Sequence, residues 1–326
     1  MGTTTTRPFR FGFTGGASSK RDRLLASARE VEALGYDTFG LADHFVRPFA
    51  PLIAGQAVAD ATRTLRITQT VLAQDFREPA VLAKELATLD VLSEGRLQVG
   101  LGAGWLRQEY EDASIRFASA SERIARLEET TIILKGLFAE GPFSFAGEHY
   151  SINGLVGVPR PVQQPGPAIM IGGGGRKLLS VGGRQADIVQ LMPSNPGGKS
   201  LLDATQYSAE AVEEKIGWIA DAAGGRFDDI ELSAQLLECA VTDRPEEHLS
   251  DFADRIAMVT ERMGGARVDL DLDDLRRSPI VAIGSLDEIC EKLTETRARY
   301  GISYFSAPVD AKPEIMAPVV ERLAGT

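Results

Sequence analysis

Short apolar runs alternate along the chain with stretches in which apolar residues recur every three or four positions. The runs have the length and the Val, Ile and Thr content of buried strands, and the longer stretches have the period of amphipathic helices. The pattern predicts eight strands, at residues 9–14, 38–42, 65–73, 97–103, 168–171, 187–192, 230–241 and 302–307.

Helices are predicted between most of these strands. Gly35 and Gly95 mark two helix ends, and Pro79 opens a helix at a position where its missing N–H costs nothing. Ser285 and Glu288 have the spacing of a capping box. The apolar stripes that define the helices are at Leu24, Ala28 and Val31, at Leu82, Leu86 and Leu89, at Ile124, Leu127 and Leu134, at residues 178–185, at about 209–223, and at Ile289 and Leu293.

Two segments interrupt this rhythm. Residues 140–167 are rich in Gly, Pro and aromatic side chains and predict an excursion with a small hairpin at 143–150. Residues 243–279 are acidic and only partly helical in pattern. The remaining strand and helix units follow one another without a break, so we expect a single (β/α)8 TIM barrel over residues 1–326, with insertions at about 140–167 and 243–279.

The competing architecture is a doubly wound open sheet. Such a dinucleotide-binding sheet carries G-x-G-x-x-G directly after its first strand. Here the first strand ends in Phe13-Thr14-Gly15-Gly16-Ala17, which lacks that spacing.

Composition narrows the range of partners. The 326 residues carry a formal net charge of −11, which disfavours nucleic acid and anionic membrane surfaces as partners. The chain has no apolar run of about 18 residues and no signal-like N-terminus, so we expect no membrane partner. The two cysteines, Cys239 and Cys290, form no metal-ligand spacing and fit a reducing cytoplasm. We expect a cytoplasmic protein that acts on a small molecule and holds no metal.

The chemistry of a TIM barrel lies at the carboxyl ends of its strands. His44 follows the second strand and is placed to donate a proton to a ligand, while Asp43 is placed to fix its tautomer or to accept from a ring N–H. A structural histidine that caps a loop is the alternative. His149 and His248 lie in polar or irregular segments, where structural roles are expected.

Glycines alternate at the end of the fourth strand and are followed by Trp105. Gly102 and Gly104 allow close approach of a planar ligand or, alternatively, of a neighbouring strand. Trp105 is predicted to form an aromatic wall of the site or a plug in the core.

Four consecutive glycines, Gly172 to Gly175, separate the fifth strand from its helix. Free backbone N–H groups at such a turn form an anion site, which the helix dipole and the following Arg176 and Lys177 strengthen. A flexible connector is the alternative. Because no reactive triad, metal cluster or Walker sequence is evident, we expect a phosphorylated planar cofactor to supply the chemistry.

Several motifs together resemble the bacterial luciferase-like superfamily, and most of all its branch that uses coenzyme F420. They are Leu34-Gly35-Tyr36-Asp37, Ala42-Asp43-His44-Phe45, Phe76-Arg77-Glu78-Pro79, Ser93-Glu94-Gly95-Arg96, Gly100-Leu101-Gly102-Ala103-Gly104-Trp105, Gly172 to Gly175 and Tyr300-Gly301-Ile302-Ser303-Tyr304. The resemblance implies a barrel with an insertion, hydride transfer at C5 of the deazaflavin, a homodimer, and a non-prolyl cis peptide at Thr70–Val71.

The resemblance also assigns roles to residues. His44 and Trp105 are the predicted catalytic residues. The predicted cofactor contacts are Asp43, His44, Thr70, Val71, Gln74, Gly102, Gly104, Gly173, Gly174, Gly175 and Arg176. Of these, Gly174, Gly175 and Arg176 would hold the phosphate.

Two positions depart from the sugar-phosphate dehydrogenases of this branch. Those enzymes carry a Glu where this chain has Trp105, and a Trp where it has Pro48. A pocket lined by Phe45, Phe49 and Trp105 suits a less polar substrate. We therefore expect a reductase of an activated C=C, C=N or C=O bond, with His44 as proton donor. The alternatives are an FMN-dependent monooxygenase of the same fold and a non-catalytic flavin-binding barrel.

Overall fold

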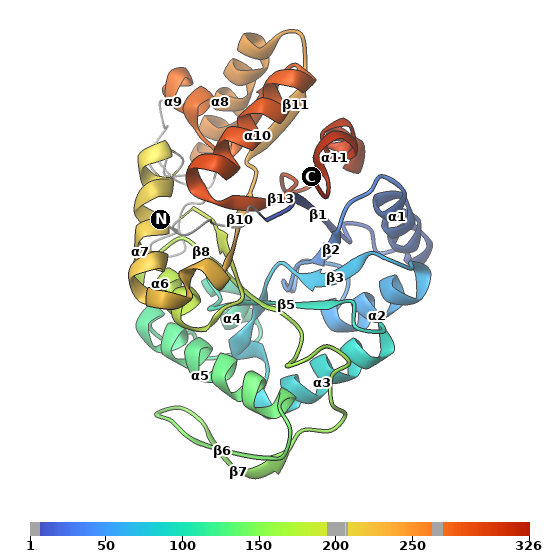
Figure 1. The fold of residues 1–326 in the computed structure, drawn as a ribbon, viewed down its shortest axis with the longest axis vertical. Helices are drawn as coiled ribbons and strands as arrows, with labels where there is room; N and C mark the ends of the chain where they lie inside the picture. Colours follow the sequence, from blue (N-terminus) through green and yellow to red (C-terminus); the bar gives the residue numbers. More distant parts are fainter. Residues whose placement is uncertain (1–6, 194–205, 207, 263–269) are drawn as a thin grey trace.

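Parallel strands close into a barrel in the computed structural model, which describes residues 7–193, 206, 208–262 and 270–326 (Figure 1). The ladder runs β3-β2-β1-β13-β10-β9-β8-β5, and pairing of β3 with β5 closes it. The predicted TIM-barrel fold is confirmed. Its strands are β1 Arg10–Gly15, β2 Thr38–Leu41, β3 Arg66–Gln69, β5 Leu97–Gly102, β8 Ile169–Gly173, β9 Ile188–Leu191, β10 Glu231–Gln235 and β13 Ile302–Ser306.

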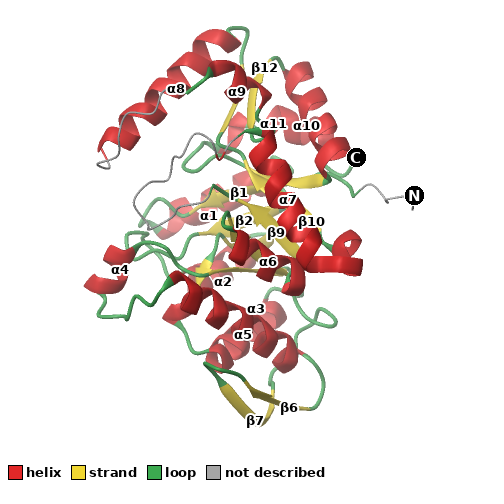
Figure 2. Cartoon of the chain, turned by 90° about the vertical axis from the view of Figure 1, so that its left-hand side faces the viewer, coloured by secondary structure: helices red, strands yellow, loops and turns green. Residues whose placement is uncertain are grey.

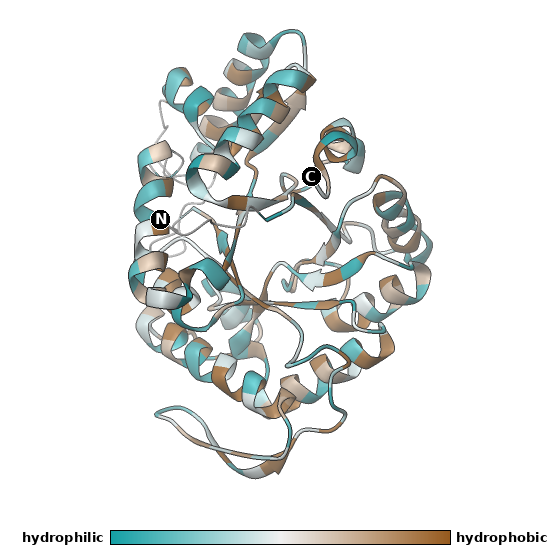
Figure 3. Cartoon of the chain, in the orientation of Figure 1, coloured by the Kyte–Doolittle hydropathy of each residue, from teal (hydrophilic) through white to brown (hydrophobic). Residues whose placement is uncertain are grey.

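Helices surround the barrel (Figure 2). The outward side chains of the strands are buried beneath them. Phe11, Phe39, Ile67 and Leu101 are fully buried in this layer. The helices mix hydrophobic and hydrophilic residues along their length, as amphipathic helices do (Figure 3). They are α1 Arg21–Ala33, α2 Pro51–Ala61, α3 Pro79–Leu92, α5 Ala120–Phe138, α6 Arg176–Gln185, α7 Ala209–Ala223, α10 Leu286–Tyr300 and α11 Ala317–Leu323, with the predicted capping box present on α10.

The third predicted strand is interrupted near its end. β3 stops at Gln69, and the chain resumes pairing with β5 as β4, Leu72–Ala73, before a short turn at Gln74–Phe76. The peptide bond between Thr70 and Val71 is cis, which confirms the expectation drawn from the resemblance.

The seventh predicted strand, 230–241, is two strands rather than one. β10 ends at Gln235, and β11 Glu238–Val241 pairs instead with β12 Val281–Gly284 in a separate sheet. The chain leaves the barrel at Leu237, whose N–H donates to the carbonyl of Ile280 (2.8 Å). The single apolar run therefore conceals a change of sheet.

The segment between β11 and β12 supplies two helices above the barrel (Figure 1). α8 Pro245–Arg262 and α9 Leu272–Arg277 account for the helical part expected in 243–279, and 263–269 lie outside the described residues. No helix within the described ranges is long and apolar enough to cross a bilayer. A small core of its own joins these elements, formed by Leu249, Phe252, Ile256, Leu275 and Val281.

A hairpin projects beside α3 and α5, within the predicted excursion (Figure 1). Its strands are β6 Pro142–Ala146 and β7 Ser151–Val156, so the turn lies inside the predicted range of 143–150 and the second strand runs beyond it. The carboxylate of Glu129 on α5 accepts hydrogen bonds from the N–H groups of residues 148, 149 and 150 and fixes the turn.

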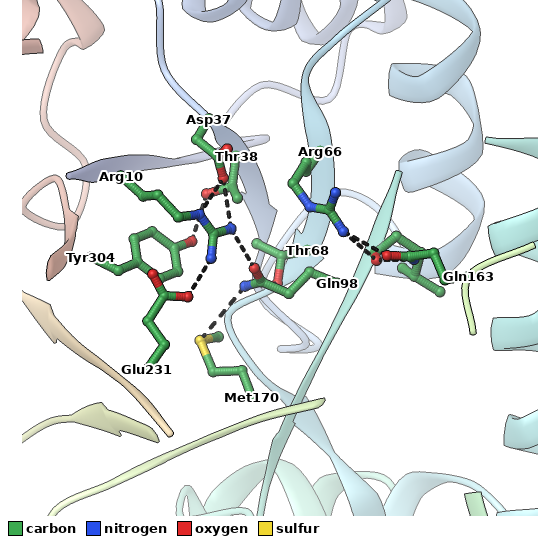
Figure 4. Close-up of polar contacts among 11 residues, drawn as sticks. Arg10, Asp37, Thr38, Arg66, Thr68, Gln98, Gln163, Met170, Glu231 and Tyr304 are labelled. Carbon is green, nitrogen blue, oxygen red and sulfur yellow. Dashed lines mark hydrogen bonds and ion pairs between the residues drawn. The ribbon is translucent and has the colours of Figure 1, made fainter. Parts of the chain in front are cut away.

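The amino-terminal end of the barrel interior is tied together by Arg10 (Figure 4). Its guanidinium donates to Asp37 (2.7 and 3.0 Å), to Glu231 (2.5 Å) and to Gln98 (2.8 Å), and lies over the ring of Tyr304. Burial lowers the pKa of Arg10, but the two carboxylates more than offset this effect and leave it raised. One side chain thus links β1 to β5, to β10 and to the residue before β2.

Replacing Arg10 with Met should lower the free energy of unfolding by roughly 2–4 kcal/mol, because Asp37 and Glu231 lose their partner. Chemical denaturation measures this loss. Arg21→Met is the control, since Arg21 is exposed and pairs loosely with Asp22 (3.5 Å). That change should cost less than about 0.5 kcal/mol. Equal stability of the two variants would contradict a central role for Arg10.

Candidate active site

Asp43 follows β2 and is committed to an ion pair. Its carboxylate accepts two hydrogen bonds from Arg77 (2.6 and 3.1 Å) and one from the N–H of Ala73 (3.0 Å). The expectation that Asp43 bonds to the His44 ring is wrong, because these donors engage both of its oxygens and His44 pairs with another carboxylate. Asp43 instead anchors the segment that follows the cis peptide.

His44 and Trp105 meet at the carboxyl end of the barrel, although 61 positions separate them in the sequence. Their rings lie edge to face, with ring centroids 5.8 Å apart. His44 Nδ1 lies 2.7 Å from Oε2 of Glu109, a residue of the short helix α4 Arg107–Asp112. The Glu109 side chain is 7% exposed and that of His44 is 26% exposed. Sequence reasoning paired the two predicted catalytic residues but missed Glu109.

The glycines at the end of β5 and just after it make room for the protein's own atoms. A Cβ at Gly100 would lie 1.9 Å from the carbonyl oxygen of Gln69, and one at Gly102 would lie 2.5 Å from Val71. At Gly104, where φ is +70°, it would lie 1.8 Å from the hydroxyl of Tyr110. The structure therefore favours the close-packing alternative over open approach of a ligand at Gly102 and Gly104.

The side chains of Thr70 and Val71 project into the barrel interior at its carboxyl end. The Val71 side chain lies over Gly102 and also faces Gly172, at 3.3 Å from a Cβ built there. The Thr70 hydroxyl is 3.3 Å from that of Thr14 on β1. These two side chains therefore cover the interior between β1, β5 and β8, which fits their predicted place beside a flat ring.

Gln74 is buried in a polar network that engages both the oxygen and the nitrogen of its amide. Its side-chain oxygen accepts from the hydroxyls of Thr130 and Tyr150, both at 3.3 Å, and its nitrogen donates to Asp75. Burial raises the pKa of the Asp75 carboxyl, and Arg126, 3.4 Å away, partly offsets that rise. The network holds the loop after β4 against α5, so the structure gives Gln74 a structural setting.

The glycine turn connects β8 to α6 as predicted. β8 ends at Gly173, Gly174 is buried, and Gly175 caps a helix that begins at Arg176. Arg176 is exposed and makes no ion pair or hydrogen bond within the described part of the chain. The first N–H groups of a helix have no acceptor inside the helix. The turn therefore combines unsatisfied donors with an unpaired positive charge, which fits a phosphate.

Three further polar residues lie in the barrel interior, on β9, β10 and β13. Glu231 faces inward to Arg10, so Ser233, two positions on, shares that face. Its hydroxyl is buried without a partner among the described residues. Gln190 donates to the hydroxyl of Ser306 (3.2 Å). Polar residues within otherwise apolar strands were the signal that sequence reasoning passed over.

Comparisons with known proteins agree with the barrel fold and identify similar sequences. A family model described as luciferase-like monooxygenase matches residues 3–303. An F420-dependent glucose-6-phosphate dehydrogenase of Kineococcus radiotolerans is 32% identical over 245 residues, covering 71% of this chain and 72% of the relative. An FMNH(2)-dependent dimethylsulfone monooxygenase of Pseudomonas putida is 34% identical over 131 residues, 40% of this chain and just over a third (36%) of the relative's length.

A solved structure extends the likeness of fold to nearly the whole chain. The coenzyme F420 dependent tetrahydromethanopterin reductase from Methanopyrus kandleri superposes with a TM-score of 0.75 at 16% identity. The match covers 97% of this chain and 98% of that one. At this identity the likeness concerns the fold.

Replacing Gly104 with Ala should lower the free energy of unfolding by roughly 2–4 kcal/mol, because the methyl group meets Tyr110 and the backbone has positive φ. Thermal or chemical unfolding measures this loss. Gly217→Ala in α7 is the matched control, since nothing lies within 4 Å of the added Cβ. That variant should gain about 0.5–1 kcal/mol. A neutral Gly104→Ala would show that Tyr110 does not occupy this space.

Proposed function

Because the chain belongs to the family of luciferase-like monooxygenases, we propose that this oxidoreductase transfers a hydride between C5 of coenzyme F420 and a small organic substrate, in the direction that reduces an activated C=C, C=N or C=O bond. The observation that carries the proposal is the meeting of His44 with Trp105 at the carboxyl end of the barrel. The glycine turn lies at that same end, so the proposed proton donor and the proposed anion site are both at the carboxyl end of the barrel.

The residues present fit a planar cofactor with a phosphate. Gly174, Gly175 and Arg176 would hold the phosphate through backbone N–H groups and one free guanidinium. Val71 would support the ring, since its side chain already covers the interior between β5 and β8. When bound, the deazaflavin supplies the hydride at C5.

His44 supplies the proton in this reaction. On reduction of the substrate double bond, the imidazolium of His44 would give a proton to the atom that does not receive the hydride, which would leave the ring neutral. Because Glu109 occupies Nδ1, the proton leaves from Nε2. Trp105 packs edge-on against the ring and excludes water from one side of it.

The lining of the mouth supports a less polar substrate than a sugar phosphate. Phe45 is 60% exposed and packs against Phe76 with ring centroids 5.1 Å apart, and Trp105 packs against His44. Aromatic walls of this kind suit apolar or conjugated molecules. The proposal also includes a homodimer, which the exposed apolar side chains of Ile53, Val81 and Leu92 on α2 and α3 support.

An FMN-dependent monooxygenase is the second candidate. The dimethylsulfone monooxygenase among the relatives favours it, because its name specifies reduced FMN. FMN is also planar and carries a phosphate, so the same glycine turn would hold it. Equilibrium titration with each cofactor separates the two, and tight FMN binding without F420 binding would reverse the order.

Removing the positive charge beside the glycine turn should weaken cofactor binding. Arg176→Gln is expected to raise the Kd for F420 about tenfold, since a hydrogen bond to a charged group is lost. Gly174→Asp should raise it further, because a carboxylate would face the phosphate. Fluorescence titration measures both. Gly225→Asp adds the same charge at an exposed glycine with open space around it and should leave Kd unchanged. Unaltered affinity in both turn variants would remove the phosphate assignment.

Replacing His44 with Ala should lower kcat by about 10²- to 10⁴-fold, the usual contribution of general acid catalysis, while the Kd for F420 changes little. The readout is the oxidation of reduced F420 in the presence of enones, imines or quinones. His149→Ala is the control and should keep full activity. Turnover that survives His44→Ala would favour the non-catalytic barrel, or a different proton donor.

A further inference from the structure

We propose that Glu109 is a positioning residue that holds the proton of His44 on Nδ1 and so presents Nε2 to the substrate. The proposal rests on the function proposed above for His44, but its central observation does not need the cofactor. It assigns a role to a buried carboxylate that neither the sequence motifs nor the relatives' names identify.

The hydrogen bond itself determines which nitrogen carries the proton. Oε2 of Glu109 lies 2.7 Å from Nδ1 of His44. An ionised carboxylate only accepts hydrogen bonds, so Nδ1 must donate. A neutral His44 then has its lone pair on Nε2, and a charged His44 carries a second, transferable proton there. Either way, Nε2 is the nitrogen left for a ligand.

The burial of Glu109 makes His44 its essential partner. Oε1 is buried and has no hydrogen-bond partner among the described residues, and the only ion pair of this carboxylate there is with His44. A buried carboxylate without compensation is costly. Its fixed position, 2.7 Å from Nδ1, therefore orients the imidazole ring.

The helix that carries Glu109 is anchored on its other side. Tyr110, the next residue, is fully buried between Phe76 and Phe117, with ring centroids 5.0 and 4.9 Å away, and its hydroxyl lies 3.4 Å from Asp75. Arg123 donates to the carbonyl groups of residues 103, 104 and 118, which fixes the loops before and after α4. Glu109 is thus held by packing that does not involve His44.

A purely structural ion pair is the competing explanation. In that case Glu109 would stabilise the loop after β2, and its loss would lower stability and substrate affinity without changing the state of the imidazole. The two explanations differ in the tautomer of His44 and in whether kcat or KM changes, so both are measured.

The first measurement is ¹⁵N NMR of the histidine side chains in the cofactor-free protein. The chain has three histidines, so His149→Ala and His248→Ala assign the His44 signals. We expect His44 to carry its proton on Nδ1 at neutral or alkaline pH. Glu109→Leu should abolish this preference and give an averaged mixture of tautomers. A wild-type ring protonated on Nε2 alone, or an unchanged pattern in Glu109→Leu, overturns the proposal.

The second measurement is steady-state kinetics with reduced F420. Glu109→Gln, which keeps the shape of the side chain, should lower kcat about 10- to 100-fold and change KM less than about threefold. Glu109→Asp keeps the charge and should recover part of the loss. Glu111→Gln is the control, since Glu111 lies on the same helix, half-exposed and 3.6 Å from Arg107. It should behave as wild type.

The outcomes separate the two proposals. If kcat falls no further in Glu109→Gln than in Glu111→Gln, or if KM alone rises, Glu109 is structural and the inference fails. Thermal unfolding of each variant identifies a folding defect, and Glu109→Asp then decides through its partial rescue. If wild type neither binds F420 nor oxidises its reduced form, the proposed function fails, whereas the tautomer measurement still tests Glu109.

Discussion

The pairing of β3 with β5 closes the barrel, and the contacts at its carboxyl end depend on that closure. Closure places the loop after β2 beside the loop after β5, so that His44 meets Trp105 and Glu109. Beyond Gln69, β4 replaces β3 as the neighbour of β5. The contacts of His44 with Trp105 and Glu109 therefore result from the closed barrel topology rather than from proximity in the chain.

The two ends of the barrel interior satisfy their polar groups differently. At the amino-terminal end, Arg10 is saturated by Asp37, Glu231 and Gln98. At the carboxyl end, one oxygen of Glu109 is buried without a partner among the described residues. Buried polar groups are normally satisfied. In barrel enzymes generally, the amino-terminal end contributes stability and the carboxyl end carries the site.

Sequence reasoning predicted what depends on local pattern and missed what depends on distant contacts. The alternation of strands and helices and the glycine turn can be recognised from neighbouring residues, and the cis peptide was expected from a family resemblance. Glu109 could not be found this way, because its partner is 65 positions away and Asp43 was a nearer carboxylate. Likewise, an apolar run does not reveal that residues 230–241 change sheet, and α2, rich in Ala, has too weak a periodicity to stand out. Nothing in the sequence around Tyr110 indicates that its side chain fills the space beside Gly104.

The side chain at position 71 forms the floor of the barrel interior at its carboxyl end. Because Val71 spans the gap left by Gly102 and Gly172, its branched methyl groups, and not the strands beneath, form the floor there. A smaller residue would lower that floor and a larger one would raise it, with the surrounding scaffold unchanged. Related barrels can in this way accept rings of different thickness or tilt by varying one residue, while His44 and Glu109 keep their positions.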